Sequence, residues 1–292
     1  MSTSELAAPV RPAPARGLST RLLRSELRLV FGRRRNQALL VALACVPVLI
    51  GVAIRLSSGS PRRGGGGGGG PAFISQIAGN GLFVAFTALV VTLPLFLPLA
   101  VSVASGEAVA GEAATGTLRN LLVVPVGRTR LLLVKFAGIV AFGVAAALSV
   151  ALAGVVIGFV LFPVGPVSLL SGGTLGVGTA LVRVLLVALY VAAMLAGLAA
   201  IGLFASTLTE VPIAAMAVTA ITAVVVQILN AVPQISAIHP YLLTDWWLRF
   251  GDLLRDPVVY DDMVRGLLVT GAYIAVFGAL AWARLTTKDV SS

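Results

Sequence analysis

Charged, thiol and imidazole side chains are scarce in this sequence. Only 11% of the 292 residues are charged and 58% are hydrophobic, whereas a soluble protein has about 25% charged residues. The one cysteine, Cys45, excludes a disulfide framework within the chain and a cysteine metal site. The one histidine, His239, excludes a histidine-cluster metal site. We therefore expect an all-α, polytopic membrane protein without a metal or other cofactor.

The sequence also lacks the motifs of the common membrane enzymes and of ATP hydrolysis. Residues 111–117 approach the spacing of a phosphate-binding loop, but Thr117 stands where the phosphate-binding lysine must be. There is no H-E-x-x-H motif, no G-x-S-x-G motif and no pair of aspartates within an apolar run. We therefore expect a non-catalytic chain, with any ATP hydrolysis in a separate polypeptide.

Ionisable residues are almost absent from the apolar runs, except near their ends. Ion-coupled transporters usually need such residues, because charges inside the membrane mark the ion pathway. This absence argues against a secondary transporter and favours an energy source outside the bilayer.

What the sequence does contain is a series of long apolar runs. These predict six transmembrane helices, at about 37–56, 79–103, 134–162, 180–203, 211–231 and 267–282. Pro94 and Pro98 stand one helical turn apart and predict a bend in the second span. In the third span, Gly154 and Gly158 form a G-x-x-x-G pattern, which is typical of closely packed helices.

The segments outside the spans also have readable patterns. We expect residues 1–17 to form a disordered tail, 18–35 an amphipathic helix in the membrane interface, and 285–292 a short polar tail. Seven glycines, Gly64–Gly70, predict a flexible tether. Residues 233–264 predict an interfacial or re-entrant amphipathic helix, because apolar residues recur there at helical spacing: Leu242, Leu243, Trp246, Trp247, Phe250, Leu253 and Leu254.

The distribution of positive charge predicts the orientation. The net charge is +10, and eight of the 21 basic residues precede Asn36, next to the first span. With six spans, 14 basic residues lie on the side of the two termini and seven on the other side. We therefore expect both termini in the cytoplasm and an attraction to anionic membrane lipid rather than to nucleic acid.

The main polar interruption between spans is the loop 104–133. Here we expect Ser105 to cap a short helix that carries Glu107 in its first turn and Glu112 a turn later. Gly116 suits the end of that helix, and Thr117 can cap the next one. A further cap at Thr129 would begin the helix that continues through Lys135 into the membrane.

This loop contains an ordered series of residues: Gly111-Glu112, Gly116-Thr117-Leu118, Leu121-Leu122, Pro125-Val126, Arg128 and Lys135. The series resembles the loop between the second and third spans of ABC-2 type transporter permeases, although Arg119 stands where an acidic residue is more usual. The resemblance implies a permease subunit in the plasma (inner) membrane, for an exporter of a hydrophobic or amphipathic substrate. Its partners would be a separate ABC ATPase subunit and a second permease copy or a homologous permease.

In that family the loop forms the coupling helix that docks on the ATPase. By resemblance, the candidate coupling residues are Glu107, Glu112, Gly116, Thr117 and Arg128. We expect Glu107 to serve order within the chain and Glu112 to serve coupling. The alternative is a membrane anchor or sensor that binds a cytoplasmic partner and transports nothing.

Overall fold

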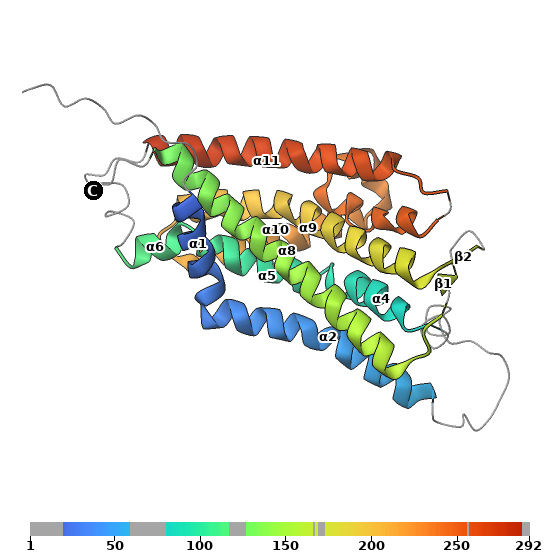
Figure 1. Cartoon of the computed structure of the whole chain (residues 1–292). Helices are drawn as coiled ribbons and strands as arrows, with labels where there is room; N and C mark the ends of the chain where they lie inside the picture. Colours follow the sequence, from blue (N-terminus) through green and yellow to red (C-terminus); the bar gives the residue numbers. More distant parts are fainter. Residues whose placement is uncertain are drawn as a thin grey trace, which may run out of the picture.

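The computed structural model describes residues 20–58, 80–116, 127–165, 167–168, 173–255 and 257–287 (Figure 1). These residues are helical except for connections and one pair of two-residue strands, β1 (Val167–Ser168) and β2 (Thr174–Leu175), which pair antiparallel. The prediction of an all-α membrane protein is thus confirmed. The predicted tail 1–17, the glycine tether and the last residues, 288–292, lie outside the described residues.

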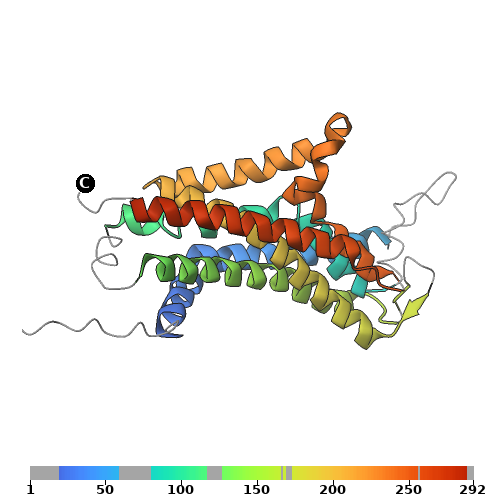
Figure 2. The same cartoon turned by 90° about the horizontal axis from the view of Figure 1, so that it is seen from above.

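Five helices are long and apolar enough to cross a bilayer: α2 (Arg34–Ser58), α8 (Arg128–Leu161), α9 (Val177–Leu208), α10 (Pro212–Asn230) and α11 (Asp261–Thr287). A sixth span results if α4 (Leu82–Thr92) and α5 (Phe96–Gly106) are taken as one broken helix. Figure 2 shows these helices running lengthwise beside one another. The last helix is longer at both ends than the predicted 267–282.

The break between α4 and α5 follows from proline chemistry. The two helices meet at a bend of 57°, which confirms the bend predicted from Pro94 and Pro98. Because Pro98 has no N–H, the carbonyl of Pro94 loses the donor that a continuous helix would give it. Gln227 of α10 replaces that donor, with its Nε2 2.5 Å from the Pro94 oxygen. The bend is therefore fixed by a hydrogen bond to another helix.

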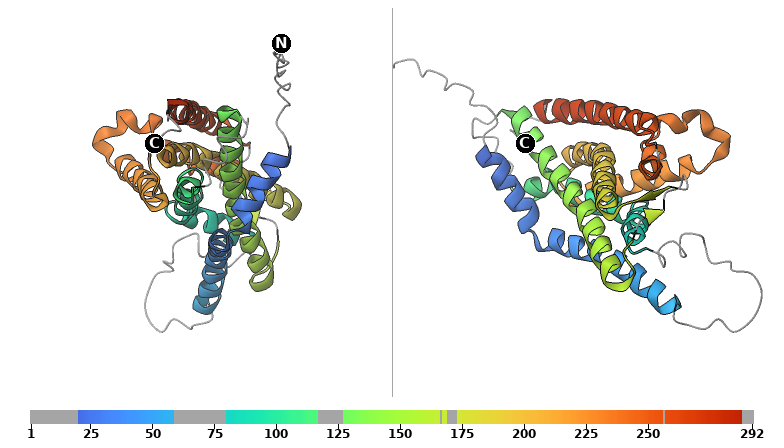
Figure 3. Two further views of the ribbon diagram at one scale, coloured as in Figure 1. Left: turned by 90° about the vertical axis from the view of Figure 1, so that its left-hand side faces the viewer. Right: turned by 45° about the vertical axis from the view of Figure 1, so that its right-hand side comes forward.

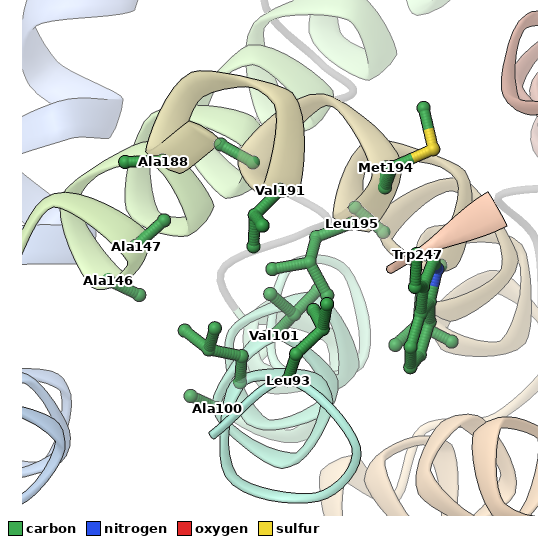
Figure 4. Close-up of a cluster of buried hydrophobic side chains, with 14 of the residues drawn as sticks. Leu93, Ala100, Val101, Ala146, Ala147, Ala188, Val191, Met194, Leu195 and Trp247 are labelled. Atoms are coloured by element: carbon green, nitrogen blue, oxygen red, sulfur yellow. The ribbon is translucent and has the colours of Figure 1, made fainter. Parts of the chain in front are cut away.

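The helix α9 forms the centre of the bundle. The most apolar 18-residue stretch of α9 is 78% buried, whereas the corresponding stretch of α10 is 17% buried. Figure 4 shows Val191 and Leu195 of α9 among buried side chains of α5, such as Val101, and of α8, such as Ala147. Small residues on α9 are suited to this position, because they let several helices approach it at once.

The G-x-x-x-G pattern of α8 lies where α8 meets α4. A Cβ on Gly154 would lie 2.6 Å from the Cα of Ala85, and a Cβ on Gly158 would meet the backbone of Gly81. Neither position can hold a side chain without separating the two helices. The packing role predicted for this pattern is therefore confirmed.

The amphipathic segment near the N-terminus forms α1 (Thr20–Gly32), which lies at a steep angle to α2 and packs on α8 (Figure 3). Its apolar face includes Phe31, whose ring centroid is 6.3 Å from that of Phe142 in α8. Arg21, Arg24 and Arg28 remain exposed. The helix thus has one face on the bundle and a basic face outside it.

The segment before the last span is not one α-helix. It forms three short 3-10 helices: η1 (Pro233–Tyr241), η2 (Leu243–Trp246) and η3 (Arg249–Leu254). Pro240 interrupts the backbone donors, and Leu242 has an extended conformation that separates η1 from η2. The predicted apolar stripe is nevertheless present and turns into the protein, since Trp247 is 2% exposed. The stripe packs among α9, α10 and α11.

Candidate coupling site at one end of the bundle

One end of the bundle contains the described residues of the predicted coupling loop. There α5 turns into the short helix α6 (Ala110–Ala114), and the same end holds α1, the start of α8 and the end of α11 (Figure 1). We call this region the coupling end. Six of its charged residues are joined in two separate groups, one around Glu107 and the other around Lys135.

The short helix predicted to begin at Ser105 does not exist. Instead α5 continues to Gly106, and the Ser105 hydroxyl donates to the carbonyl of Ser102 within α5. The helix can continue because α5 packs closely on its neighbours: a Cβ on Gly106 would lie 2.7 Å from the backbone nitrogen of Met216 in α10. Glu107 and Glu112 therefore do not share one short helix, because Glu107 lies in the turn after α5 and Glu112 lies in α6.

Ser206, near the end of α9, holds the turn from α5 to α6. Its hydroxyl oxygen accepts hydrogen bonds from the backbone N–H groups of Val109 and Ala110, at 3.0 and 2.9 Å. The same hydroxyl donates to the carbonyl of Gly106 at 2.9 Å. Sequence reasoning missed this role, because Ser206 belongs to a different turn almost 100 residues along the chain. It caps α6 from outside, since the N-cap residue Val109 has no polar side chain.

Glu107 joins the turn to the junction of α1 and α2. Its two carboxylate oxygens lie 2.5 Å from Arg33 Nη1 and 2.6 Å from Arg35 Nη2. Arg33 occupies the break between α1 and α2, so this group connects three helices. The arginine side chains are 37% and 43% exposed, and solvent therefore weakens the attraction.

Glu112 and Glu26 form a buried group with Lys135 of α8. Lys135 Nζ lies 2.6 Å from Glu112 Oε1 and 3.6 Å from Glu26 Oε1, and the lysine side chain is 1% exposed. A lysine is rarely buried so completely unless it is paired. Gly138, one turn later, leaves room for Glu26, because a Cβ there would lie 3.0 Å from Glu26 Cγ. The triad links α1, α6 and α8.

The placement expected for Glu112 is therefore wrong in this conformation. We expected Glu107 to serve order within the chain and Glu112 to serve coupling, with its side chain toward a partner. Instead Glu112 turns inward and is 9% exposed, because the ammonium of Lys135 holds it. A role for Glu112 in coupling stays a prediction, but it would act through Lys135 and not by surface contact.

Arg128 lies at the start of α8 and reaches the end of α11. Its Nη1 donates to the carbonyls of Leu285 and Thr286, at 3.1 and 2.6 Å. A cation is favourable at this place, because the last carbonyls of a helix carry partial negative charge. The neighbouring Thr129 does not cap α8 as expected, since Gly127 is the N-cap residue, and its hydroxyl accepts from Trp282 Nε1.

Gly116 has φ +70°, a conformation that favours glycine, so the helix stop predicted there is confirmed. Thr117, the remaining candidate, lies outside the described residues, as do residues 118–126. Just before it, Ala114, Thr115 and Gly116 are exposed. The helix α6 thus has an inner flank fixed by ionic and hydrogen bonds and an exposed C-terminal tip.

The arrangement is suited to transmitting a displacement. In the described part of the chain, no three His, Cys, Asp or Glu side chains are placed to hold a metal ion. The described contacts instead connect α6 directly to α8, α9 and α10, and through Lys135 of α8 to α1. A force on α6 would therefore reach several membrane helices at once.

Comparison with known proteins gives one family. The model of the family described as "ABC-2 family transporter protein" matches residues 33–225. The match covers about two thirds of the chain, from the α1–α2 junction into α10. A comparison with curated proteins gave no match.

Proposed function

The chain belongs to the ABC-2 transporter permease family, and from this premise we propose that it is the membrane half of an ATP-driven exporter of a hydrophobic or amphipathic substrate. A separate ABC ATPase subunit supplies the energy. A second permease copy, or a homologous permease, completes the transport pathway.

The observation that carries this proposal is the bonding of α6. Its inner flank is fixed by Ser206 and by the Glu112–Lys135 pair, whereas its tip is exposed. A rigid inner flank with an exposed tip is the arrangement that a docking element needs if it is to move membrane helices. We assign Gly116 and Thr117 to the docking surface, and Glu107, Glu112 and Arg128 to positioning that surface.

The bend between α4 and α5 is the place where a movement of α6 would change the angle between membrane helices. A push on α6 passes directly into α5, because only the turn 107–109 separates them. The residues 93–95 at the other end of α5 are outside both helices, and hinges are often found at such element ends. We propose that α5 changes its angle to α4 when the ATPase subunit moves.

The charge distribution supports the cytoplasmic plasma-membrane (inner-membrane) location of the coupling end. The exposed arginines of α1 and the Arg33–Glu107–Arg35 group lie near it. With 14 basic residues on this side against seven on the other, we propose that both termini are cytoplasmic. The basic face of α1 then rests on anionic lipid headgroups.

The test is reconstitution of the chain with its candidate ATPase in lipid vesicles. We expect the two to copurify, and we expect an amphipathic substrate to stimulate ATP hydrolysis and to accumulate on one side of the membrane. If the ATPase binds but no substrate changes hydrolysis or crosses the membrane, the exporter proposal fails. The alternative, a non-transporting anchor or sensor, would then be favoured.

A further inference from the structure

A cavity of about 170 Å³, lined by apolar and polar side chains, lies where the α4–α5 break meets the end of α10 and η2. Its lining includes Leu93, Pro94, Asn230, Thr244, Trp247 and Leu248. Figure 4 shows Trp247 and Leu93, which both belong to the main buried cluster. In a chain with so few polar residues in its spans, this gathering needs an explanation.

Two buried polar atoms in the lining have no hydrogen-bond partner among the described residues: Asn230 Oδ1 and Trp247 Nε1. Leaving a buried polar atom unpaired is unfavourable. The other two polar side chains of the lining bond elsewhere: Gln227 Nε2 donates to the carbonyl of Pro94, and Thr244 Oγ1 donates to the carbonyl of Val226.

A comparison with the neighbouring Trp246 shows that the missing hydrogen-bond partner is particular to Trp247. Trp246 is also buried, yet its Nε1 donates to the carbonyl of Pro240 at 3.0 Å. The same short segment therefore satisfies one indole N–H and leaves the next one, on a residue that lines the cavity, without a partner among the described residues. One unpaired atom is a donor and the other an acceptor, and a hydroxyl or a primary amide can bond to both at once.

An apolar groove continues from this cavity. It has a volume of about 230 Å³, lies between α5 and α10, and shares Pro94 with the first cavity. Pro98, Leu99, Ile221 and Val224 contribute to its lining. A polar head in the cavity and an aliphatic chain in the groove would together match both surfaces.

We propose that the cavity and groove bind an uncharged amphiphile with a hydroxyl or primary-amide head. The head bonds to Trp247 Nε1 and Asn230 Oδ1, and the aliphatic chain lies along α5 and α10. This inference rests on the proposed function, for which it names a substrate class. The cavity volume is several times the roughly 30 Å³ that one water occupies in the liquid, so there is room for more than a bridging water.

The experiment is photolabelling of the purified chain by a long-chain alcohol that carries a diazirine in its chain. Labelled residues are mapped by mass spectrometry. We expect labelling concentrated in the groove, near Leu99 and Val224. We also expect the unlabelled alcohol and primary amide to compete well, and the methyl ether and alkane of equal length to compete poorly. The ether discriminates because it accepts a hydrogen bond but cannot donate one to Asn230.

Two variants test the polar contacts. Trp247→Phe keeps an aromatic ring but removes the N–H, and Asn230→Leu removes the acceptor. Each should lower groove labelling by roughly three- to tenfold, the usual effect of one hydrogen bond. Trp282→Phe, which removes an indole at the coupling end, is the matched control and should leave labelling unchanged. Thermal melting of each variant checks that it is folded.

Labelling spread evenly over the lipid-facing helices would overturn the proposal, as would equal competition by alcohol and alkane. Unchanged labelling of folded Trp247→Phe would also overturn it, and would leave water as the partner of the two atoms. The measurement needs no ATPase. Failure of transport therefore leaves this result intact, and failure of labelling in a transport-competent complex refutes this site alone.

Discussion

The buried triad around Lys135 allows a quantitative prediction, from the single change Lys135→Met. Methionine is an unbranched side chain one heavy atom shorter than lysine, and it removes the charge. Glu26 and Glu112, whose side chains are 12% and 11% exposed, would then lie near each other without the ammonium that separates them. Removing one partner of a buried ion pair typically costs about 3–5 kcal/mol. We expect a loss of this size in the free energy of unfolding.

The matched changes separate charge from packing. Glu112→Gln leaves Lys135 with Glu26 and should cost less, about 1–3 kcal/mol. The double variant Lys135→Met/Glu112→Gln removes the unpaired charge on α6 and should be more stable than Lys135→Met alone. A double-mutant cycle, measured by denaturant unfolding in detergent, gives the coupling energy directly. A Lys135→Met protein within 0.5 kcal/mol of the wild type would refute the view that this triad holds α6 to α8.

Three further predictions concern other contacts. Ser206→Ala leaves the N–H groups of Val109 and Ala110 without their acceptor and should lower the free energy of unfolding by about 1–3 kcal/mol. The control Ser149→Ala removes a hydroxyl that bonds within α8 and should have little effect. Equal losses in the two variants would contradict the capping role of Ser206. Gly158→Ala should destabilise by about 1–3 kcal/mol through overpacking against Gly81, whereas Gly278→Ala, with nothing within 4 Å of its added Cβ, should not. In a Cys45→Ala background, a cysteine at Thr174 should react with an impermeant thiol reagent outside intact cells and one at Thr115 should not; the reverse pattern would overturn the proposed orientation.

The membrane fold was largely predictable from the sequence. Hydrophobic length identifies a span without knowledge of its neighbours, because the bilayer thickness sets how many apolar residues are needed. The prolines at 94 and 98 and the glycines at 154 and 158 act through their own backbone and size, so their effects were also predictable. The same holds for Gly116, since only glycine readily adopts its positive φ.

The coupling end was less predictable, because its geometry depends on contacts between distant residues. Ser105 looks like a helix cap only if α5 ends before it, and packing on α9 and α10 extends α5 to Gly106. The inward turn of Glu112 depends on Lys135, 23 positions later, and on Glu26 in α1. The segment before the last span likewise has a helical apolar stripe, but it forms 3-10 turns, with Pro240 and the extended Leu242 between η1 and η2.

The coupling role of the candidate residues stays a prediction, whereas the contacts expected for them were misjudged in detail. The ordered loop series singled out the loop 104–133, but the contacts of a single residue depend on which distant side chains it meets. Trp247 illustrates the same limit, because its place in an apolar stripe predicted burial and gave no sign that its N–H would lack a partner.

The central claim is that α6 transmits ATPase movement to the membrane helices through Glu112 and Lys135. The most direct measurement is the amount of substrate transported per ATP hydrolysed by the reconstituted complex, compared between wild type and Glu112→Gln. Because the exposed tip of α6 is unchanged, the variant should still bind the ATPase and hydrolyse ATP. Its transport per ATP should fall about tenfold or more, as expected for the loss of a buried charged contact. A folded Glu112→Gln complex with the wild-type ratio would contradict the claim.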